Sequence, residues 1–76
     1  MFTRFDIIAK DRMGIALDIL NTIYNQGISL VSVEVFPEKV NVKMYEIEEK
    51  QKKELTEKLC EIHDVISVME TDLLEY

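Results

Sequence analysis

Residues that could carry out catalysis are scarce in this sequence. The one histidine, His63, and the one cysteine, Cys60, stand three positions apart in a charged segment. Two such side chains can share a helix face, but they do not complete a metal site, and the sequence holds no further cysteine or histidine to do so. A lone cysteine usually packs as a small apolar residue. The sequence therefore predicts no catalytic residues, no metal and no cofactor.

The stretch KDRMGIALDIL, residues 10–20, is the other candidate site. Gly14 stands at the start of an apolar helical pattern, where glycine costs about 1 kcal/mol relative to alanine, so it indicates a turn or a close approach to the backbone. Asp11 is placed to cap this helix by accepting a hydrogen bond from the N–H of Met13 or Gly14. The free N–H groups at the helix mouth also suit a carboxylate ligand. The loop is therefore interpreted either as a structural turn or as a ligand contact.

The hydrophobic pattern divides the chain into four strands and two helices. Alternation places Phe5, Ile7 and Ala9 on one face of a strand, and in another strand it places Val40, Val42 and Met44 against Asn41, Lys43 and Tyr45. Gly27 falls where a helix ends in a left-handed residue. The predicted elements are a strand over residues 2–10, a helix over 13–26, strands over 28–36 and 40–47, a helix over 48–64 and a strand over 65–71, with 72–76 trailing off. This βαββαβ order predicts an α+β, ferredoxin-like sandwich: a four-stranded antiparallel sheet with two helices on one face, in a single domain over residues 1–76.

The predicted arrangement of the sheet bears on association. Right-handed crossovers are expected to bring strands one and four together in the middle and to leave strands two and three at the edges. The second strand is apolar on both faces, and only Glu34 interrupts it. Such an edge favours pairing with another copy. The expected dimer contacts are Ile28, Leu30, Val31, Val33 and Val35.

The two predicted helices differ in character. In the first helix, Ile19, Ile23 and Tyr24 belong to the stripe that is expected to face the core. The second helix is expected to be a surface helix with a narrow buried stripe of Leu55, Leu59 and Ile62. Its charged face is expected to be solvated, with acids that precede bases by four positions, as in the pair of Glu48 and Lys52.

The charge distribution restricts the classes of partner. The formal net charge is −6, and residues 1–44 carry five acids and five bases, so the whole excess lies after residue 44. Nucleic-acid surfaces need clustered lysine and arginine, so direct contact with DNA or RNA is not expected. No apolar run approaches the roughly 20 residues that cross a bilayer, and no secretory pattern follows Met1. A single cysteine provides no disulfide framework, which fits a reducing cytoplasm.

Three motifs together resemble the ACT domain, a small regulatory module that senses amino acids in metabolic enzymes and some transcription regulators. KDRMGIALDIL resembles the DRPG-type loop and helix of that family, NQGISLVSVEV its GINI-type start of the second strand, and HDVISVMET its V-x-x-V strand. The chain departs from the usual pattern at Met13, where proline is common, and at Ser29, where asparagine or aspartate is common. Within the family it is most similar to the amino-terminal ACT domain of tyrosine-repressor-like regulators of the sigma-54-activator type.

The resemblance implies a non-catalytic, amino-acid-sensing and dimerising domain, a piece of a longer transcription regulator of amino-acid metabolism. It also implies that two copies pair and that an amino acid, aromatic if the regulator similarity holds, binds near their interface. The implied ligand contacts are Asp11, Arg12, Met13, Gly14 and Ile15 of one chain and Gly27, Ile28, Ser29 and Leu30 of the other.

Two other interpretations stay open beside this one. A pairing domain without a ligand pocket is favoured by Ser29, which weakens the implied polar contact. A small ferredoxin-like enzyme such as an acylphosphatase would need an arginine-bearing phosphate loop and a catalytic asparagine. Arg12 by itself does not build such a glycine-rich cradle. Titration with the twenty amino acids separates the amino-acid sensor from the pairing domain without a ligand pocket.

Overall fold

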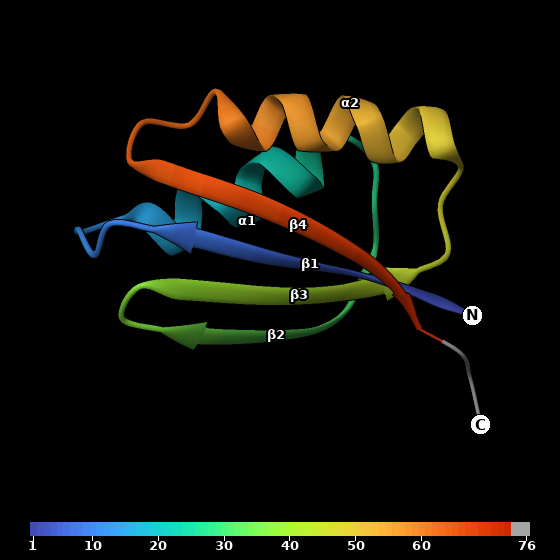
Figure 1. Cartoon of the computed structure of the whole chain (residues 1–76), viewed down its shortest axis with the longest axis horizontal. Coiled ribbons are helices and arrows are strands. Elements are labelled where there is room, and N and C mark those ends of the chain that lie inside the picture. Colours follow the sequence, from blue (N-terminus) through green and yellow to red (C-terminus); the bar gives the residue numbers. More distant parts are fainter. Residues whose placement is uncertain (74–76) are drawn as a thin grey trace.

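Strands and helices alternate along the chain in the predicted order. The computed structural model describes residues 1–73, and its elements are β1 (Phe2–Ala9), α1 (Ile15–Asn25), β2 (Leu30–Phe36), β3 (Lys39–Tyr45), α2 (Glu49–Cys60) and β4 (Val65–Leu73). All strand pairs are antiparallel, and both helices lie on one face of the sheet (Figure 1). The predicted ferredoxin-like sandwich is confirmed. The final strand runs two residues further than expected, and the rest of the predicted tail lies outside the described residues.

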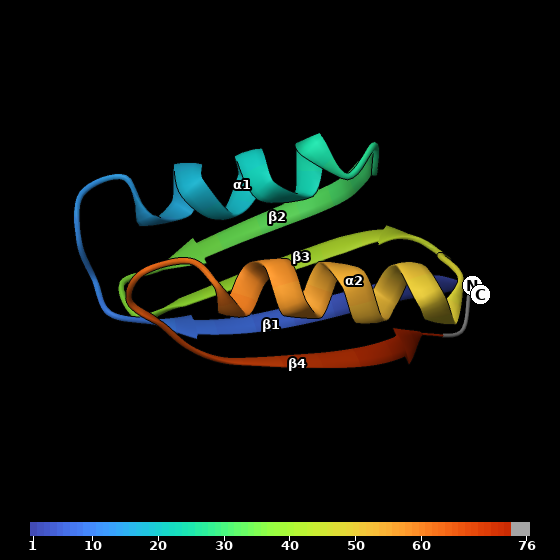
Figure 2. The same cartoon turned by 90° about the horizontal axis from the view of Figure 1, so that it is seen from above.

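The order of strands across the sheet differs from the prediction. It is β2-β3-β1-β4, so β1 and β3 are central while β2 and β4 are the edges (Figure 2). The expectation of β2 at an edge is confirmed, but the central place given to β4 and the edge place given to β3 were wrong. Each helical crossover connects two parallel strands, and in an antiparallel sheet one further strand must lie between them. Thus β3 lies between β1 and β2, and β1 lies between β3 and β4.

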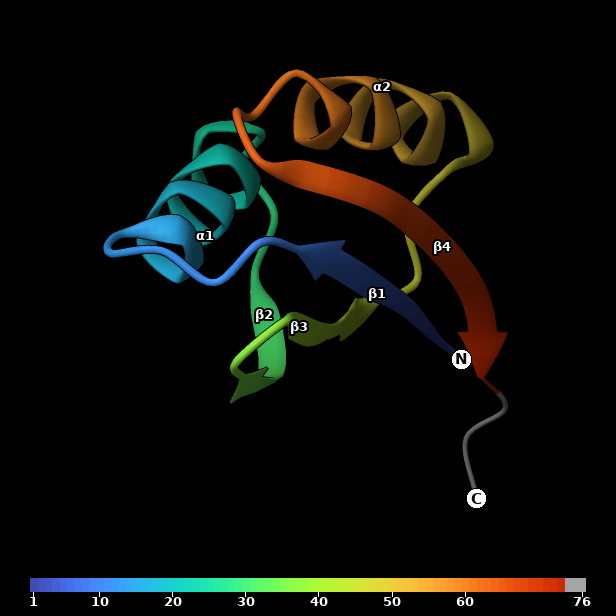
Figure 3. The same ribbon diagram turned by 60° about the vertical axis from the view of Figure 1, so that its left-hand side comes forward.

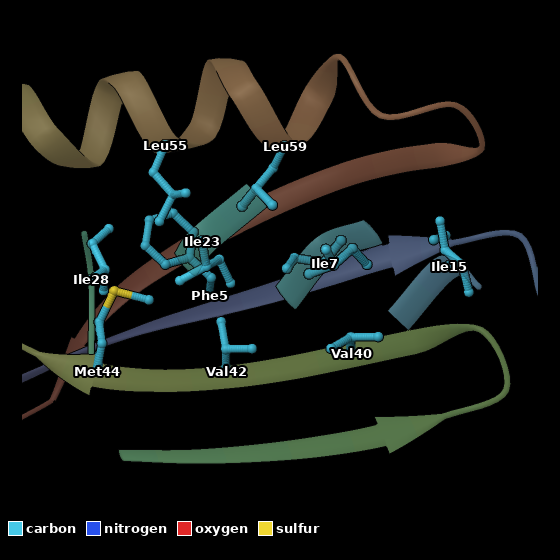
Figure 4. Close-up of a cluster of buried hydrophobic side chains, with 12 residues drawn as sticks. Phe5, Ile7, Ile15, Ile23, Ile28, Val40, Val42, Met44, Leu55 and Leu59 are labelled. Atoms are coloured by element: carbon cyan, nitrogen blue, oxygen red, sulfur yellow. The ribbon is translucent and has the colours of Figure 1, made fainter. Parts of the chain in front are cut away.

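The hydrophobic core lies between the helices and the sheet. The central strands present alternate residues to it, and the helices cover them with one apolar stripe each. The labelled members in Figure 4 are Phe5, Ile7, Ile15, Ile23, Ile28, Val40, Val42, Met44, Leu55 and Leu59. The intervening residues of the strands lie on the other side of the sheet, which no helix covers (Figure 3). That side is called the open face below.

Helix α1 begins two residues later than predicted, and Asp11 does not cap it. The residue before the helix is Gly14, whose φ of 82° is in the left-handed region, and no side chain caps this end. The turn through Gly14 separates Asp11 from the first helical N–H groups, and the carbonyl of Arg12 accepts from the Ile15 N–H at 3.3 Å. The predicted left-handed end at Gly27 is confirmed by its φ of 74°.

Lys52 was expected on the solvated face of the second helix, but the structure buries it. Its side chain is 6% exposed, and its Nζ lies 3.1 Å from the Glu49 carboxylate and 2.9 Å from that of Asp72 in β4. The Thr3 hydroxyl also donates to Asp72, at 3.3 Å. The hydrogen bond from Lys52 lowers the pKa of Asp72 below its ordinary 3.8, and the same bond raises the pKa of Lys52. Helical spacing could not show this ion pair, because Asp72 is brought by another element.

Replacing Asp72 with asparagine is expected to lower the melting temperature at pH 7. Because the folded pKa of Asp72 is depressed, its contribution is present above the unfolded pKa and disappears as the pH falls through the folded one. The difference between parent and variant should therefore shrink below about pH 4. Circular dichroism melts from pH 2.5 to 8 measure it, with Glu70→Gln in the same strand as the control. A difference that stays constant over this range would rule out the ion pair as its source.

Candidate functional site

The loop between β1 and α1 is fastened to two neighbouring connections at one end of the sheet. The Ala9 N–H donates to the Glu38 carbonyl in the β2–β3 turn at 3.1 Å, and the Lys10 N–H donates to the Asp64 carbonyl before β4 at 2.9 Å. These three connections lie at the same end of the sheet in Figures 1 and 2. The position of the loop is therefore set by residues far away in the sequence.

Arg12 holds this loop in place through its guanidinium group. Its Nε donates to the Asp64 carboxylate at 2.9 Å, and its Nη2 donates to the Asp18 carboxylate and the His63 carbonyl, both at 2.9 Å. Its Nη1 donates to the Met13 carbonyl at 3.2 Å. These four bonds engage most of the five N–H donors of the side chain. Arg12 therefore has a structural role, which the sequence analysis missed, and its ligand contact stays a prediction.

The mouth of α1 presents backbone donors to an open space. Within residues 1–73, the N–H groups of Ala16 and Leu17 have no hydrogen-bond acceptor, and no side chain caps the helix. Unpaired N–H groups at a helix start attract anions. A Cβ added to Gly14 would meet no atom within 4 Å, so this glycine is required by its backbone conformation and leaves room beside it.

A hollow of about 320 Å³ lies between this helix mouth and the β2–β3 hairpin, and we call it the loop hollow. Among the predicted loop residues, Asp11, Arg12, Gly14 and Ile15 line it, whereas the Met13 side chain is 98% exposed. The hairpin contributes Val35, Phe36, Pro37 and Lys39, which the sequence analysis did not assign to the site. The topology could have revealed these residues, because β1 and β2 run parallel and therefore end at the same end of the sheet.

A second hollow, of about 770 Å³, lies where α1 ends and β2 begins, and we call it the strand hollow. The four predicted contacts Gly27, Ile28, Ser29 and Leu30 line it together with Leu20, Tyr24 and Asn25. Tyr24 is 77% exposed, so its assignment to the core stripe was wrong. It belongs instead to a second apolar stripe at helical spacing, formed by residues 17, 20 and 24. The helical spacing of these residues could have predicted that Leu20 and Tyr24 line the strand hollow.

The two hollows lie at opposite ends of α1. This helix has 11 residues, which corresponds to a length of about 16 Å. A single chain therefore does not bring the two predicted halves of the ligand site together.

The outer edge of β2 carries apolar side chains that its own chain leaves uncovered. Val31, Val33 and Val35 are 40%, 37% and 57% exposed. Val33 and Val35 are paired with Val42 and Val40, so they lie on the helix side of the sheet, beyond the part that the helices bury. Of the other predicted dimer contacts, Ile28 is in the core and Leu30 is partly buried against it. Among the predicted dimer contacts, these three valines therefore provide most of the exposed apolar surface.

The single cysteine and the single histidine lie at the surface. Cys60 is exposed, and the His63 side chain is 90% exposed. Over residues 1–73 no group of three or more histidine, cysteine, aspartate or glutamate side chains could hold a metal ion. Neither described helix is long and apolar enough to cross a membrane.

Comparison with known proteins identifies the class of this fold. The model of the ACT domain family matches residues 3–64, and the chain belongs to that family. The crystal structure of the ACT domain from the GTP pyrophosphokinase of Chlorobium tepidum superposes with a TM-score of 0.82 and 15% identity, covering 93% of this chain and 97% of that one. The solution structure of that same domain superposes with a TM-score of 0.79 and 16% identity, and the match covers 100% of this chain and 91% of that one.

A third structure comes from an enzyme of amino-acid metabolism. The ligand-free regulatory subunit of aspartate kinase from Thermus thermophilus matches with a TM-score of 0.59 and 18% identity. The match covers 93% of this chain and 50% of that subunit. The search of curated proteins found no match. The family match makes the chain an ACT domain, and at these identities the structural likeness shows the fold alone.

Proposed function

We propose that this domain senses an amino acid as a homodimer and forms the ligand-binding part of a transcription regulator of amino-acid metabolism. The observation that carries the sensing role is the uncapped mouth of α1, where the N–H groups of Ala16 and Leu17 face the loop hollow without an acceptor among residues 1–73. An α-carboxylate matches these donors. The regulator context rests on the similarity of three motifs to tyrosine-repressor-like proteins.

Pairing through β2 would unite the two hollows. In an antiparallel two-fold contact between β2 strands, the end of β2 in one protomer lies beside the start of β2 in its partner. The loop hollow adjoins the end of β2, and the strand hollow adjoins its start. The ligand site is therefore composed of the loop hollow of one protomer and the strand hollow of the other.

The composite site has parts that suit the two ends of an amino acid. The carboxylate accepts hydrogen bonds at the helix mouth, and the side chain enters the larger, mostly apolar strand hollow of the partner. There Leu20 and Leu30 offer apolar surface, and the Tyr24 ring offers an aromatic face at the rim. This arrangement favours an aromatic amino acid, tyrosine or phenylalanine.

Millimolar tyrosine or phenylalanine is expected to raise the melting temperature, because the ligand binds the folded state selectively. A concentration 100 times the dissociation constant stabilises by about 2.7 kcal/mol, which raises the melting temperature of a domain of this size by more than about 10 °C. Differential scanning fluorimetry with all twenty amino acids measures the shift. Tyramine, which lacks the carboxylate, is the control and should give no shift.

The absence of a shift with every amino acid would overturn the sensing role. It would favour the second candidate, a pairing domain without a ligand, for which the specific observation is Ser29 in the place of the usual asparagine or aspartate.

A further inference from the structure

The open face of the sheet carries an ordered pattern of charge. The strand registers place polar residues in two adjacent rows that cross the sheet. The acceptor row consists of Glu34, Asn41 and Asp6, and the donor row consists of Ser32, Lys43 and Arg4. A row of negative charge thus lies directly beside a row of positive charge.

Apolar residues flank the two rows. On one side Phe36 and Ile8 share a row with Lys39, and on the other side Tyr45 and Phe2 share a row. Phe36 is 48% exposed and Tyr45 64%. The Phe2 and Tyr45 rings lie 5.8 Å apart. Apolar, negative, positive and apolar rows therefore follow one another along the strands.

Asn41 in the acceptor row lacks a hydrogen-bond donor. This residue is 8% exposed, and its Oδ1 has no partner within residues 1–73. Buried polar atoms are nearly always satisfied, so an orphaned acceptor calls for a donor from outside. A hollow of about 140 Å³ lies over it, lined also by Glu34 and Arg4. The amide oxygen and the neighbouring Glu34 carboxylate form a set of acceptors suited to an ammonium group, whereas the Asp6 carboxylate already accepts from the Nε of Arg4 at 2.8 Å.

We propose that the open face is a two-fold interface to a second copy of this chain, in which Lys43 of each protomer donates to Asn41 of the other. A two-fold axis that lies in the interface, parallel to the rows and between them, places each acceptor row opposite the partner's donor row. The same operation places the Phe36 and Ile8 row opposite the partner's Tyr45 and Phe2 row. In the single chain, Lys43 Nζ lies 4.8 Å from the centre of the Phe2 ring. On association it leaves this ring and binds the acceptors of the partner.

Charge complementarity selects a second copy as the occupant. The chain has a net charge of −6, whereas the open face bears three bases, Arg4, Lys39 and Lys43, and two acids, Asp6 and Glu34. A nearly neutral face of alternating sign does not suit a polyanion, and it fits its own two-fold image. The face is separate from the β2 edge, so use of both would give a pair of dimers.

The interface is small, so its association is expected to be weak. Four strands about 4.8 Å apart and seven residues of about 3.3 Å span roughly 19 by 23 Å. This is about half of the 800 Å² that each partner buries in a standard interface. We therefore expect association at roughly 100 µM or above.

Sedimentation equilibrium from 10 µM to 1 mM tests the interface without reference to the β2 edge. The weight-average mass of the parent should rise over this range toward twice the mass of the species present at low concentration, and we call this rise the doubling. Lys43→Glu and Glu34→Lys should each abolish the doubling, and their equimolar mixture should restore it, because Glu at position 43 then faces the partner's row that carries Lys at position 34, one strand away. These variants carry net charges of −8 and −4, so overall attraction cannot explain a restored pair.

Lys53→Glu is the matched control, since it makes the same charge change at an exposed position of α2, on the other side of the sheet. It should retain the doubling. If Lys43→Glu still doubles in mass, the proposed interface is wrong. It is also wrong if the mixture does not double in mass although both variants melt at the temperature of the parent. If a variant fails to fold, the salt dependence of the parent tests the interface instead. The doubling in mass that is seen at 50 mM NaCl should disappear at 500 mM NaCl. A doubling that salt does not change would overturn the proposal.

Discussion

Replacing Phe5 with alanine is expected to destabilise the domain by about 3–5 kcal/mol. Phe5 is fully buried on the central strand β1, where it packs with core residues of both helices. A chain of 76 residues has a stability of only about 4–11 kcal/mol, at roughly 0.05–0.15 kcal/mol per residue. The loss of this one side chain therefore removes much of the margin, and in the less stable part of that range it unfolds most of the molecules.

Urea unfolding at a fixed protein concentration measures this loss. The matched control is Phe36→Ala, which deletes the same side chain from the edge strand β2, where it is 48% exposed. Because the exposed ring buries less apolar surface, the control should lose roughly 1 kcal/mol or less. Equal losses at the two positions would contradict the core that is shown in Figure 4.

Val33→Lys is expected to convert the proposed homodimer into a monomer. Val33 lies in the middle of β2 and is 37% exposed on the helix side of the sheet. A lysine there would place an unpaired ammonium in the contact, and its partner across the two-fold axis would present another. Light scattering at 10 µM should report about twice the chain mass for the parent and the chain mass for the variant.

Ile66→Lys is the control for this experiment. Ile66 is 63% exposed on the other edge strand, at the position where the register of β4 shifts. Bulges and acidic residues normally protect an edge from pairing, and β4 has both, with Glu70 and Asp72. The control should keep the parent mass. A parent that is monomeric at every concentration would defeat the β2 pairing and the composite ligand site together.

The sequence by itself determined the elements and the faces of the strands. Alternation over β1 and β3 assigned Phe5, Ile7, Val40 and Val42 to one face, and the structure buries all four. The same alternation put Asn41 on the opposite face, which is the open one. These properties are local, because a period of two or of 3.6 is set by the geometry of one element. The left-handed backbone at Gly27 was predictable for the same reason.

Tertiary structure decided which residues meet. Sequence spacing could not place β3 between β1 and β2, bring Asp72 to Lys52, or join Arg12 to Asp64 across 52 positions. It also could not show that α1 holds the two predicted halves of the ligand site apart. These contacts depend on the order in which strands pair across the sheet, which is a collective choice that buries the most apolar surface while every inner strand keeps its hydrogen bonds. The pairing order of the strands leaves no periodic pattern in the sequence, so only the folded chain reveals it.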